Sequence, residues 1–270
     1  MHPLLNIAVR AARQAGDTIV RYLSRLDEIQ VSTKGRNEYV TEVDRLAEQE
    51  IIRTIRKAYP DHGVLAEESG LDGPENYLWI IDPLDGTTNF LHGFPVFAVS
   101  IAFRHRGRLE QAVVYDPTRQ ELFTASQGAG AHLDGRRIRV SQQTKLEGSL
   151  LGTGFPYRAN MQWADQYLAM LKHLSRLAAG VRRPGAAALD LAYVAAGRYD
   201  GFWELGLKPW DIAAGALLIT EAGGRIADPL GGDTHVDLGH VVAGTPKVYE
   251  KLLKEIRPFL PDDLMNKAED

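Results

Sequence analysis

The segment from residue 79 to residue 90, WIIDPLDGTTNF, restricts the fold and chemistry of this chain more than any other segment. Its first three residues are apolar and predict a short strand that is buried on both faces. Pro83 lacks a backbone donor, so we expect the strand to stop there and to leave Asp82 at its end. Asp85 follows three residues after Asp82. Both carboxylates can therefore converge on hard cations, which prefer oxygen ligands.

The turn that follows is suited to binding a phosphate. Gly86 allows another group to approach the backbone closely. If Thr87 and Thr88 open a helical turn, the amides of residues 86–88 point outward beside a positive helix end. Leu84, between the two aspartates, can offer only its carbonyl to a ligand. The alternative is an ordinary Asp-Pro-Gly turn with Thr87 as a helix cap, and this segment alone supports both interpretations equally.

Two other acidic segments favour a binding site over a plain turn. Glu67 and Glu68 follow a short apolar run at 64–66, so a second pair of carboxylates stands at a strand end. Asp211 precedes an apolar stretch at 212–219, which predicts that it lies in the first turn of a helix. The glutamates could instead be solvated, and the aspartate could simply cap its helix. Three acidic element ends beside a phosphate-binding turn are harder to explain in that way.

Composition excludes several classes of protein. With 270 residues, 44% of them hydrophobic and 24% charged, the chain can bury a full core as one large domain or as two lobes. The net charge of −4 gives no indication of direct nucleic-acid binding. The chain contains no cysteine, which excludes disulfides, thiolate metal sites and a cysteine nucleophile. It shows no signal-peptide layout and no run near the ~18 apolar residues of a membrane span, so we expect a cytoplasmic protein.

The pattern of apolar residues predicts a layered α/β protein with two sheets. The first half has helical spacing at 3–26 and 44–59, a basic loop at 33–37, strands at 63–67, 77–82, 95–105, 109–116 and 120–125, and a hairpin at 134–135. The short connections predict antiparallel pairing. From about residue 149 strands alternate with helices, with strands at 150–154, 180–183, 201–205, 225–227 and 240–243 and helices at 161–178, 187–196, after 211 and after 246.

Taken in order, the segments AEES at 66–69, DPLDGTTNF at 82–90 and WDIAAG at 210–215 resemble the signature of the inositol monophosphatase family. The likeness covers nearly the whole chain. The segments RRPG at 182–185 and AAALDLAY at 186–193 are most similar to the bacterial SuhB branch of that family. The resemblance implies an αβαβα sandwich shared with fructose-1,6-bisphosphatase. It implies one domain over 1–270, with an amino-terminal lobe at 1–148 and a carboxy-terminal lobe at 149–270.

The resemblance also implies roles for individual residues. The implied metal ligands are Glu67, Asp82, the Leu84 carbonyl, Asp85 and Asp211. Thr87, paired with Asp44, would orient the attacking water together with Glu67, and the amides of Gly86 and Thr87 would hold the phosphate. The implied positions for the inositol ring are Asp85, Gly185, Ala186, Ala187 and Glu204. Two positions depart from the family pattern, since Ala66 stands where Gly is frequent and Ala186 where Ser or Thr is usual.

The ligand types indicate which ion the site binds. Carboxylates ~4 Å apart repel by ~4 kcal/mol per pair at an effective dielectric of ~20, so such a site requires cations. An all-oxygen set favours Mg²⁺, with Mn²⁺ as a second candidate, and the eight histidines show no zinc-ligand spacing. We expect two or three ions, with Asp82 shared between two of them. The sequence contains neither a GxxxxGK[ST] phosphate loop nor a GxSxG nucleophile elbow.

These observations predict a Mg²⁺-dependent phosphomonoesterase that acts on inositol monophosphates. The alternatives within the same fold are enzymes that cleave 3′-phosphonucleotides or fructose 1,6-bisphosphate. Similarity to the SuhB branch implies a different role, as a partner of RNA polymerase and Nus factors in antitermination of ribosomal RNA transcription, which can coexist with catalysis. The family likeness also implies a homodimer and inhibition by Li⁺. Arg182 and Arg183 could serve the partner surface or line the substrate pocket.

Overall fold

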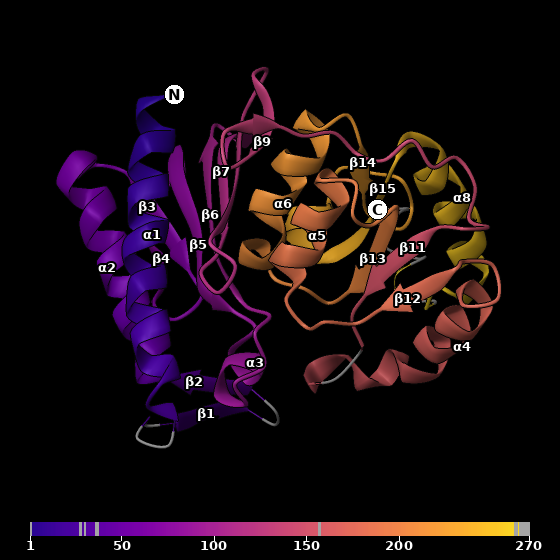
Figure 1. The fold of residues 1–270 in the computed structure, drawn as a ribbon, viewed down its shortest axis with the longest axis horizontal. Coiled ribbons are helices and arrows are strands. Elements are labelled where there is room, and N and C mark those ends of the chain that lie inside the picture. Colours follow the sequence, from indigo (N-terminus) through magenta and orange to yellow (C-terminus); the bar gives the residue numbers. More distant parts are fainter. Residues whose placement is uncertain are drawn as a thin grey trace.

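Five layers of helices and sheets make up the computed structural model (Figure 1). The structure describes residues 2–26, 29, 31–35, 38–155, 158–261 and 264. Two helices form one outer layer, an eight-stranded sheet follows, two helices fill the centre, and a five-stranded sheet and a last helical layer complete the stack. This is the αβαβα sandwich expected from the sequence.

The larger sheet is mostly an antiparallel meander, with strand order β10-β9-β8-β7-β6-β5-β3-β4. Its strands are β3 (Gly63–Ala66), β4 (Gly70–Asp72), β5 (Tyr77–Asp85), β6 (Ala98–His105), β7 (Arg108–Asp116), β8 (Glu121–Ser126), β9 (Gly130–Leu133) and β10 (Arg136–Arg137). Only β3 and β5 pair in parallel among these described strands. The predicted meander and its hairpin turns are confirmed, and β4 is an additional short strand that the sequence analysis missed.

Helices cover both faces of this sheet. The amphipathic helices α1 (Pro3–Leu23) and α2 (Glu42–Ala58) bury their apolar sides against one face, where Trp79 and Ile81 of β5 also point. The other face packs against α5 (Ala187–Ala195) and α6 (Pro209–Glu221), which lie between the two sheets. Both central helices are rich in small apolar residues and are buried nearly all round, as a layer enclosed by two sheets requires.

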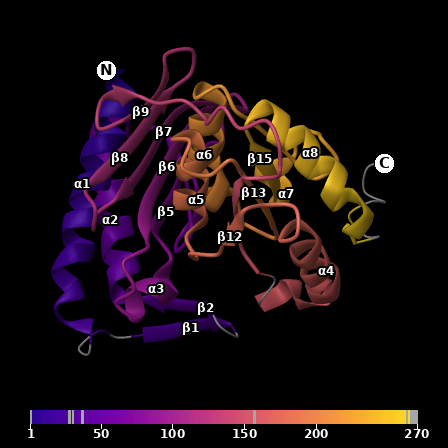
Figure 2. The same cartoon turned by 45° about the vertical axis from the view of Figure 1, so that its right-hand side comes forward.

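The smaller sheet has the strand order β12-β11-β13-β15-β14. Its strands are β12 (Gly180–Arg182), β11 (Leu150–Thr153), β13 (Gly201–Leu205), β15 (His240–Gly244) and β14 (Arg225–Ala227). Strand β11 runs parallel to both neighbours, whereas β15 is antiparallel to both of its own. The outer face carries α4 (Ala164–Leu174) and α8 (Pro246–Ile256) (Figure 2), and the 3₁₀ turns η2 (Arg158–Trp163) and η3 (Arg257–Phe259) lie beside them. Helix α7 (His235–Leu238) packs instead against α6.

Three sequence expectations are corrected. Strand β5 does not stop at Pro83 but continues to Asp85, because an irregularity in its pairing accommodates the proline. Residues 33–35 of the predicted loop at 33–37 belong instead to strand β1 (Val31–Gly35), which pairs antiparallel with β2 (Glu38–Thr41). Residues 36 and 37 lie outside the described part. The predicted helix at 161–178 is a 3₁₀ turn followed by the shorter α4.

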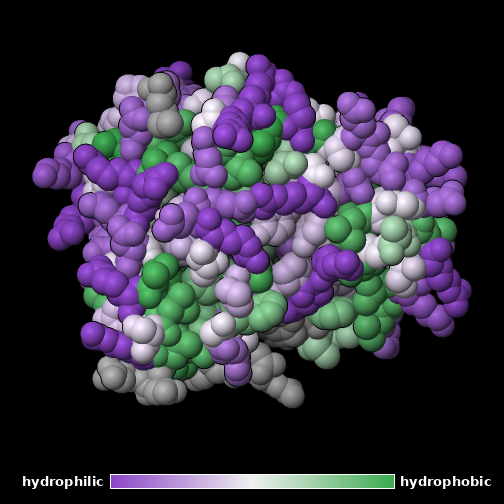
Figure 3. Space-filling view, in the orientation of Figure 1, coloured by the Kyte–Doolittle hydropathy of each residue, from purple (hydrophilic) through white to green (hydrophobic). Residues whose placement is uncertain are grey.

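The face in Figure 3 carries mostly hydrophilic side chains, with apolar groups between them. In the described part of the chain, every helix is too short or too polar to cross a membrane.

Candidate active site

An extra residue in β5 brings two aspartates to the same side of the sheet. Asp82 pairs with Ser100 of β6 and Asp85 pairs with Ala98, so three steps along β5 match two steps along β6. In a regular strand, residues three apart point to opposite faces. The extra residue shifts this phase, as in a β-bulge. Consequently Leu84 packs into the core beneath α1 and α2, while Asp85 reaches the opposite face and accepts a hydrogen bond from the backbone N–H of Ala188 at 2.7 Å.

The bulge also explains why proline is tolerated inside this strand. Pro83 lies between the Asp82–Ser100 pair and the Asp85–Ala98 pair. Regular pairing is interrupted there, so the missing backbone donor of proline removes no regular hydrogen bond between the strands. The N–H of Leu84 instead donates to Asp82 Oδ1 at 3.0 Å. The two aspartates therefore share a site as expected from the sequence, but a bulge in β5, and not the end of the strand, brings them together.

A third carboxylate comes from the start of α6. Pro209 opens this helix, and Asp211 in its first turn accepts a hydrogen bond from the N–H of Lys208 at 2.7 Å. Asp82, Asp85 and Asp211 each offer an oxygen atom, and these atoms all lie within 4.8 Å of one another. Strand β5 and the two central helices therefore meet at one acidic cluster.

Burial and mutual repulsion make this cluster costly without a cation. Asp82 is 2% exposed and Asp85 is 9% exposed. Burial is the main cause that raises the pKa of Asp82 well above its ordinary value, and the charges of Glu67, Asp85 and Asp211 add to it. Burial also raises the pKa of Asp85, with Asp211 as the next cause, although the Ala188 hydrogen bond opposes the shift. A divalent cation bound by oxygen would relieve both penalties, so the donor set fits Mg²⁺ or Mn²⁺.

Glu67 faces the same cavity from the end of β3. Its backbone N–H donates to the carbonyl of Ile81 at 3.1 Å, which fixes the chain beside β5. The next residue is held by a side chain that the sequence analysis missed, because Glu48 of α2 accepts a hydrogen bond from the N–H of Glu68 at 2.8 Å. Glu48 is buried, and burial raises its pKa. This contact ties α2 to the turn that carries Glu67.

Thr87 and Asp44, which the family resemblance pairs, are hydrogen bonded in the structure. Thr87 Oγ1 lies 2.9 Å from Asp44 Oδ1 and 3.1 Å from the carbonyl oxygen of Leu84. The other oxygen of Asp44 accepts from the backbone N–H of Thr41 at 2.8 Å and from its hydroxyl at 2.5 Å. Asp44 is fully buried, and burial raises its pKa to about 6 against these hydrogen bonds. Their roles in catalysis stay a prediction.

The turn at 86–88 has the conformation expected from the sequence. Helix α3 (Thr87–Leu91) begins directly after Gly86, which has a φ of 95°. A Cβ at Gly86 would lie 2.9 Å from the carbonyl oxygen of Val96, so a side chain there would be strained and crowded. Asn89 donates from Nδ2 to the carbonyls of Val96 at 2.7 Å and Pro184 at 2.9 Å. Asn89, which the sequence analysis did not single out, thus connects α3 to the turn before α5.

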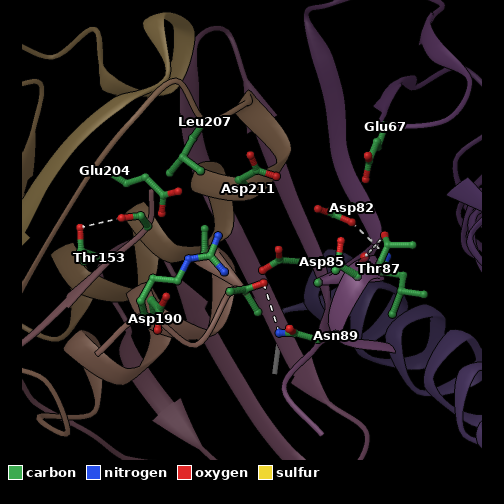
Figure 4. Close-up of a pocket in the computed structure, with 18 of the residues that line it drawn as sticks. Glu67, Asp82, Asp85, Thr87, Asn89, Thr153, Asp190, Glu204, Leu207 and Asp211 are labelled. Atoms are coloured by element: carbon green, nitrogen blue, oxygen red, sulfur yellow. Dashed lines mark hydrogen bonds between the residues drawn. The ribbon is translucent and has the colours of Figure 1, made fainter. Parts of the chain in front are cut away.

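The far wall of the cavity comes from the second half of the chain (Figure 4). Glu204 of β13 packs on Gly154, where a Cβ would lie 1.8 Å from Glu204 Oε1. Gly185 has a φ of 93°, and Ala186 and Ala187 follow it at the start of α5. Every site residue predicted from the sequence except Asp44 lines this one cavity of about 380 Å³. Thr88 of the predicted turn and Arg183, for which a place in the pocket was one alternative, also line it. The lining residues that were not predicted are Asn89, His92, Thr153, Gly154, Asp190 and Leu207.

Comparisons with known proteins find relatives along nearly the whole chain. The model of the inositol monophosphatase family matches residues 1–260. The Nus factor SuhB of Pseudomonas aeruginosa is 58% identical over 269 residues, which cover 98% of this chain and 99% of that protein. The crystal structure of the extragenic suppressor protein SuhB from Bartonella henselae superposes with a TM-score of 0.91 at 44% identity, covering 94% and 98% of the two chains.

A structure of an inositol monophosphatase from Anabaena (Nostoc) has the same fold. It superposes with a TM-score of 0.85 at 38% identity, covering 96% of this chain and 97% of that one. The layered architecture described above is therefore the inositol monophosphatase fold.

The acidic cluster predicts an unusual pH dependence for the metal-free protein. Because folding raises the pKa of Asp82 and Asp85, their stabilising contribution is present below pH ~4 and is lost as the pH rises through the raised values. Urea unfolding at pH 5 and pH 8 in a chelator should show this loss. Mg²⁺ at 100 times its dissociation constant should restore about 2.7 kcal/mol at pH 8.

The matched control is the Asp82→Asn, Asp85→Asn double variant. It should show a weaker loss of stability between pH 5 and pH 8 and no stabilisation by Mg²⁺. Equal responses in the variant and the wild type would contradict the assignment of the cation to this cluster.

Proposed function

This chain belongs to the inositol monophosphatase family, and we propose that it is a Mg²⁺-dependent phosphomonoesterase that hydrolyses inositol monophosphates to inositol and phosphate. One observation carries the proposal. Asp82, Asp85 and Asp211 converge within 4.8 Å at a cavity whose wall includes the turn at 86–88. A cation cluster beside backbone donors is the arrangement that phosphoryl chemistry requires, since most of its catalysis comes from charge and positioning.

The cations would be divided between two overlapping ligand sets. Glu67, Asp82 and the Leu84 carbonyl would hold one, and Asp82, Asp85 and Asp211 would hold another. Both sets contain only oxygen, which favours Mg²⁺ and leaves Mn²⁺ as the second candidate. When bound, such cations lower the pKa of a water molecule and stabilise the charge that develops on the ester oxygen.

Thr87 and Asp44 would position the attacking water. The Thr87 hydroxyl can donate to Asp44 or to the Leu84 carbonyl, which leaves its oxygen lone pairs to accept a hydrogen bond from water. Asp44 in turn is held by Thr41 and keeps a fixed orientation. Glu67, on the same cavity wall, would take the proton from the water. This arrangement favours direct attack by water over a covalent intermediate on Thr87.

The far wall would select the alcohol part of the ester. Glu204, Gly185, Ala186 and Ala187 would contact the inositol ring, together with Asp85. Ala186 is fully buried and brings no hydroxyl to this wall. Without that hydroxyl, the wall has one contact fewer for selecting an inositol ring. Hydrolysis of 3′-phosphonucleotides or of fructose 1,6-bisphosphate by the same chemistry is therefore the alternative.

A second role follows from the relatives rather than from the cavity. We propose that the chain also acts as a partner of RNA polymerase and Nus factors, because the Pseudomonas aeruginosa relative is named a Nus factor and covers 98% of this chain. The homodimer implied by the family resemblance is part of this proposal. Arg183 is less suited to the partner surface than to the pocket, since it lines the cavity and lies 5.7 Å over the Phe155 ring.

Phosphate release with and without Mg²⁺ tests the main proposal. Wild-type protein should release phosphate from inositol monophosphates only with the cation, and a panel of sugar and nucleotide phosphates should give slower rates. Asp82→Asn should lower kcat by about 100-fold or more, because this carboxylate would serve both cations. Asp72→Asn, at an exposed carboxylate outside the cavity, is the control. Turnover by Asp82→Asn within a few-fold of wild type at saturating Mg²⁺ would refute the proposal.

Thr87→Ala tests how the water is positioned. It should lower kcat by about 100-fold or more with little change in KM, since the lost contact is needed for reaction and not for binding. Thr87→Ser keeps the hydroxyl and should retain most of the turnover. In isotope-labelled water, the label should appear in phosphate released in a single turnover. Trapping a phosphothreonine would show that Thr87 is the nucleophile instead.

Capture of transcription proteins tests the second role. An Asp85→Asn protein should be inactive as a phosphatase but should retain purified RNA polymerase and Nus factors as well as the wild type does. Retention by neither protein would exclude the partner role, and loss in the variant alone would show that partner binding depends on the active site.

A further inference from the structure

Two buried carboxylates lie one turn apart on the same side of helix α2. Asp44 and Glu48 are four residues apart, and side chains with this spacing are neighbours on a helix surface. Asp44 is fully buried and Glu48 is 4% exposed. Asp44 Oδ1 lies 2.9 Å from Thr87 Oγ1, whereas Glu48 contacts a different segment of the active site, the turn that follows β3.

That turn, residues 67–69, joins β3 to β4 and carries Glu67. Its first N–H, that of Glu67, donates to the carbonyl of Ile81 at 3.1 Å. Its second, that of Glu68, donates to Glu48 Oε2 at 2.8 Å. The backbone and the side chain of Ser69 also form hydrogen bonds with the Glu48 carboxylate. Removing this carboxylate would therefore take away an acceptor that two successive residues of the turn share.

Helix α2 gives this contact a rigid base. Its residues Val43, Ala47 and Ile51 are fully buried in the core formed with α1 and the larger sheet, and a capping box fixes its first turn. Reacting groups must be held within about 0.5 Å of their productive geometry. Glu67 and Thr87 lie on the same side of the cavity (Figure 4), and the contacts of α2 hold the segments that carry both of them.

We propose that Glu48 is a positioning residue, which holds the turn at 67–69 so that Glu67 keeps the orientation needed to bind its cation and to take a proton from water. This inference rests on the proposed phosphatase function. One turn of α2, from Asp44 to Glu48, then determines the spacing between Thr87 and Glu67. Removing hydrogen bonds that orient metal ligands typically lowers metal affinity or activity by about 10- to 100-fold.

Three variants and two measurements test the inference. Glu48→Ala removes the shared acceptor, and Glu48→Gln keeps one acceptor oxygen without the charge. Glu50→Ala is the matched control, because Glu50 is an acid of the same helix that accepts a hydrogen bond from Thr18 of α1 at 2.8 Å. In calorimetric titration with Mg²⁺, Glu48→Ala should weaken one binding event by about 10-fold or more. At saturating Mg²⁺ it should lower kcat by about 10-fold with little change in KM, because the contacts with the ester are retained.

The controls separate positioning from a general effect on folding. Glu48→Gln and Glu50→Ala should both stay within a few-fold of wild type in Mg²⁺ affinity and in kcat. Equal effects of Glu48→Ala and Glu50→Ala, or a Glu48→Ala protein with unchanged Mg²⁺ affinity and kcat, would show that Glu48 only supports the fold and would overturn the inference. If Glu48→Ala does not fold, Glu48→Asp, which withdraws the acceptor by one methylene, takes its place under the same criteria.

The two measurements also separate this inference from the proposed function. If wild-type protein releases no phosphate from any ester, the proposed function fails. The Mg²⁺ affinities then decide on Glu48 by themselves: weakening in Glu48→Ala that Glu48→Gln and Glu50→Ala do not share supports the inference, and an unchanged affinity overturns it.

Discussion

The repulsion between Asp82, Asp85 and Asp211 is the interaction on which the rest of this structure depends. The three carboxylates come from β5 and α6 and lie within 4.8 Å of one another in a largely buried place. Folding alone cannot make that arrangement favourable, because burial and like charge both oppose ionisation. Hydrogen bonds from Ala188 and Lys208 hold two of the carboxylates, and a cation would complete the compensation.

The layered architecture determines where this cluster can form. The central helices α5 and α6 pack against the larger sheet and also contact the smaller one, so their amino-terminal ends meet β5 at a junction between both halves of the chain. A close contact maintains the central layer, since a Cβ at Gly215 would lie 2.4 Å from Leu191 Cβ. Asn89 adds a second connection by binding the carbonyl of Pro184. The cavity therefore has one wall from each half.

Much of the fold and the acidic segments of the cavity could be predicted from the sequence, because apolar periodicity and acidic element ends are local signals. The wall formed by Gly185, Ala186, Ala187 and Glu204 was expected only from the family resemblance. The bulge at Pro83 could not be predicted, since it depends on pairing with Ser100 and Ala98 of another strand. Asp190 was missed for a different reason. It is a single acid within an apolar helix, and only the packed structure shows that it faces the cavity. Glu48 and Asn89 act on backbone groups that are remote in sequence, so spacing gave no sign of them.

The bulge makes the register of β5 against β6 as important as the identity of Asp82 and Asp85. Leu84 belongs to the core under α1 and α2, and Asp85 belongs to the opposite face. Adding one residue to β6 between Ala98 and Ser100 would restore regular alternation over the three steps of β5 and turn Asp85 toward that apolar core, although both aspartates would still be present. A relative that keeps every acidic residue but carries such an insertion in β6 would therefore have lost the means of holding a cation, a change that the acidic residues alone would not reveal.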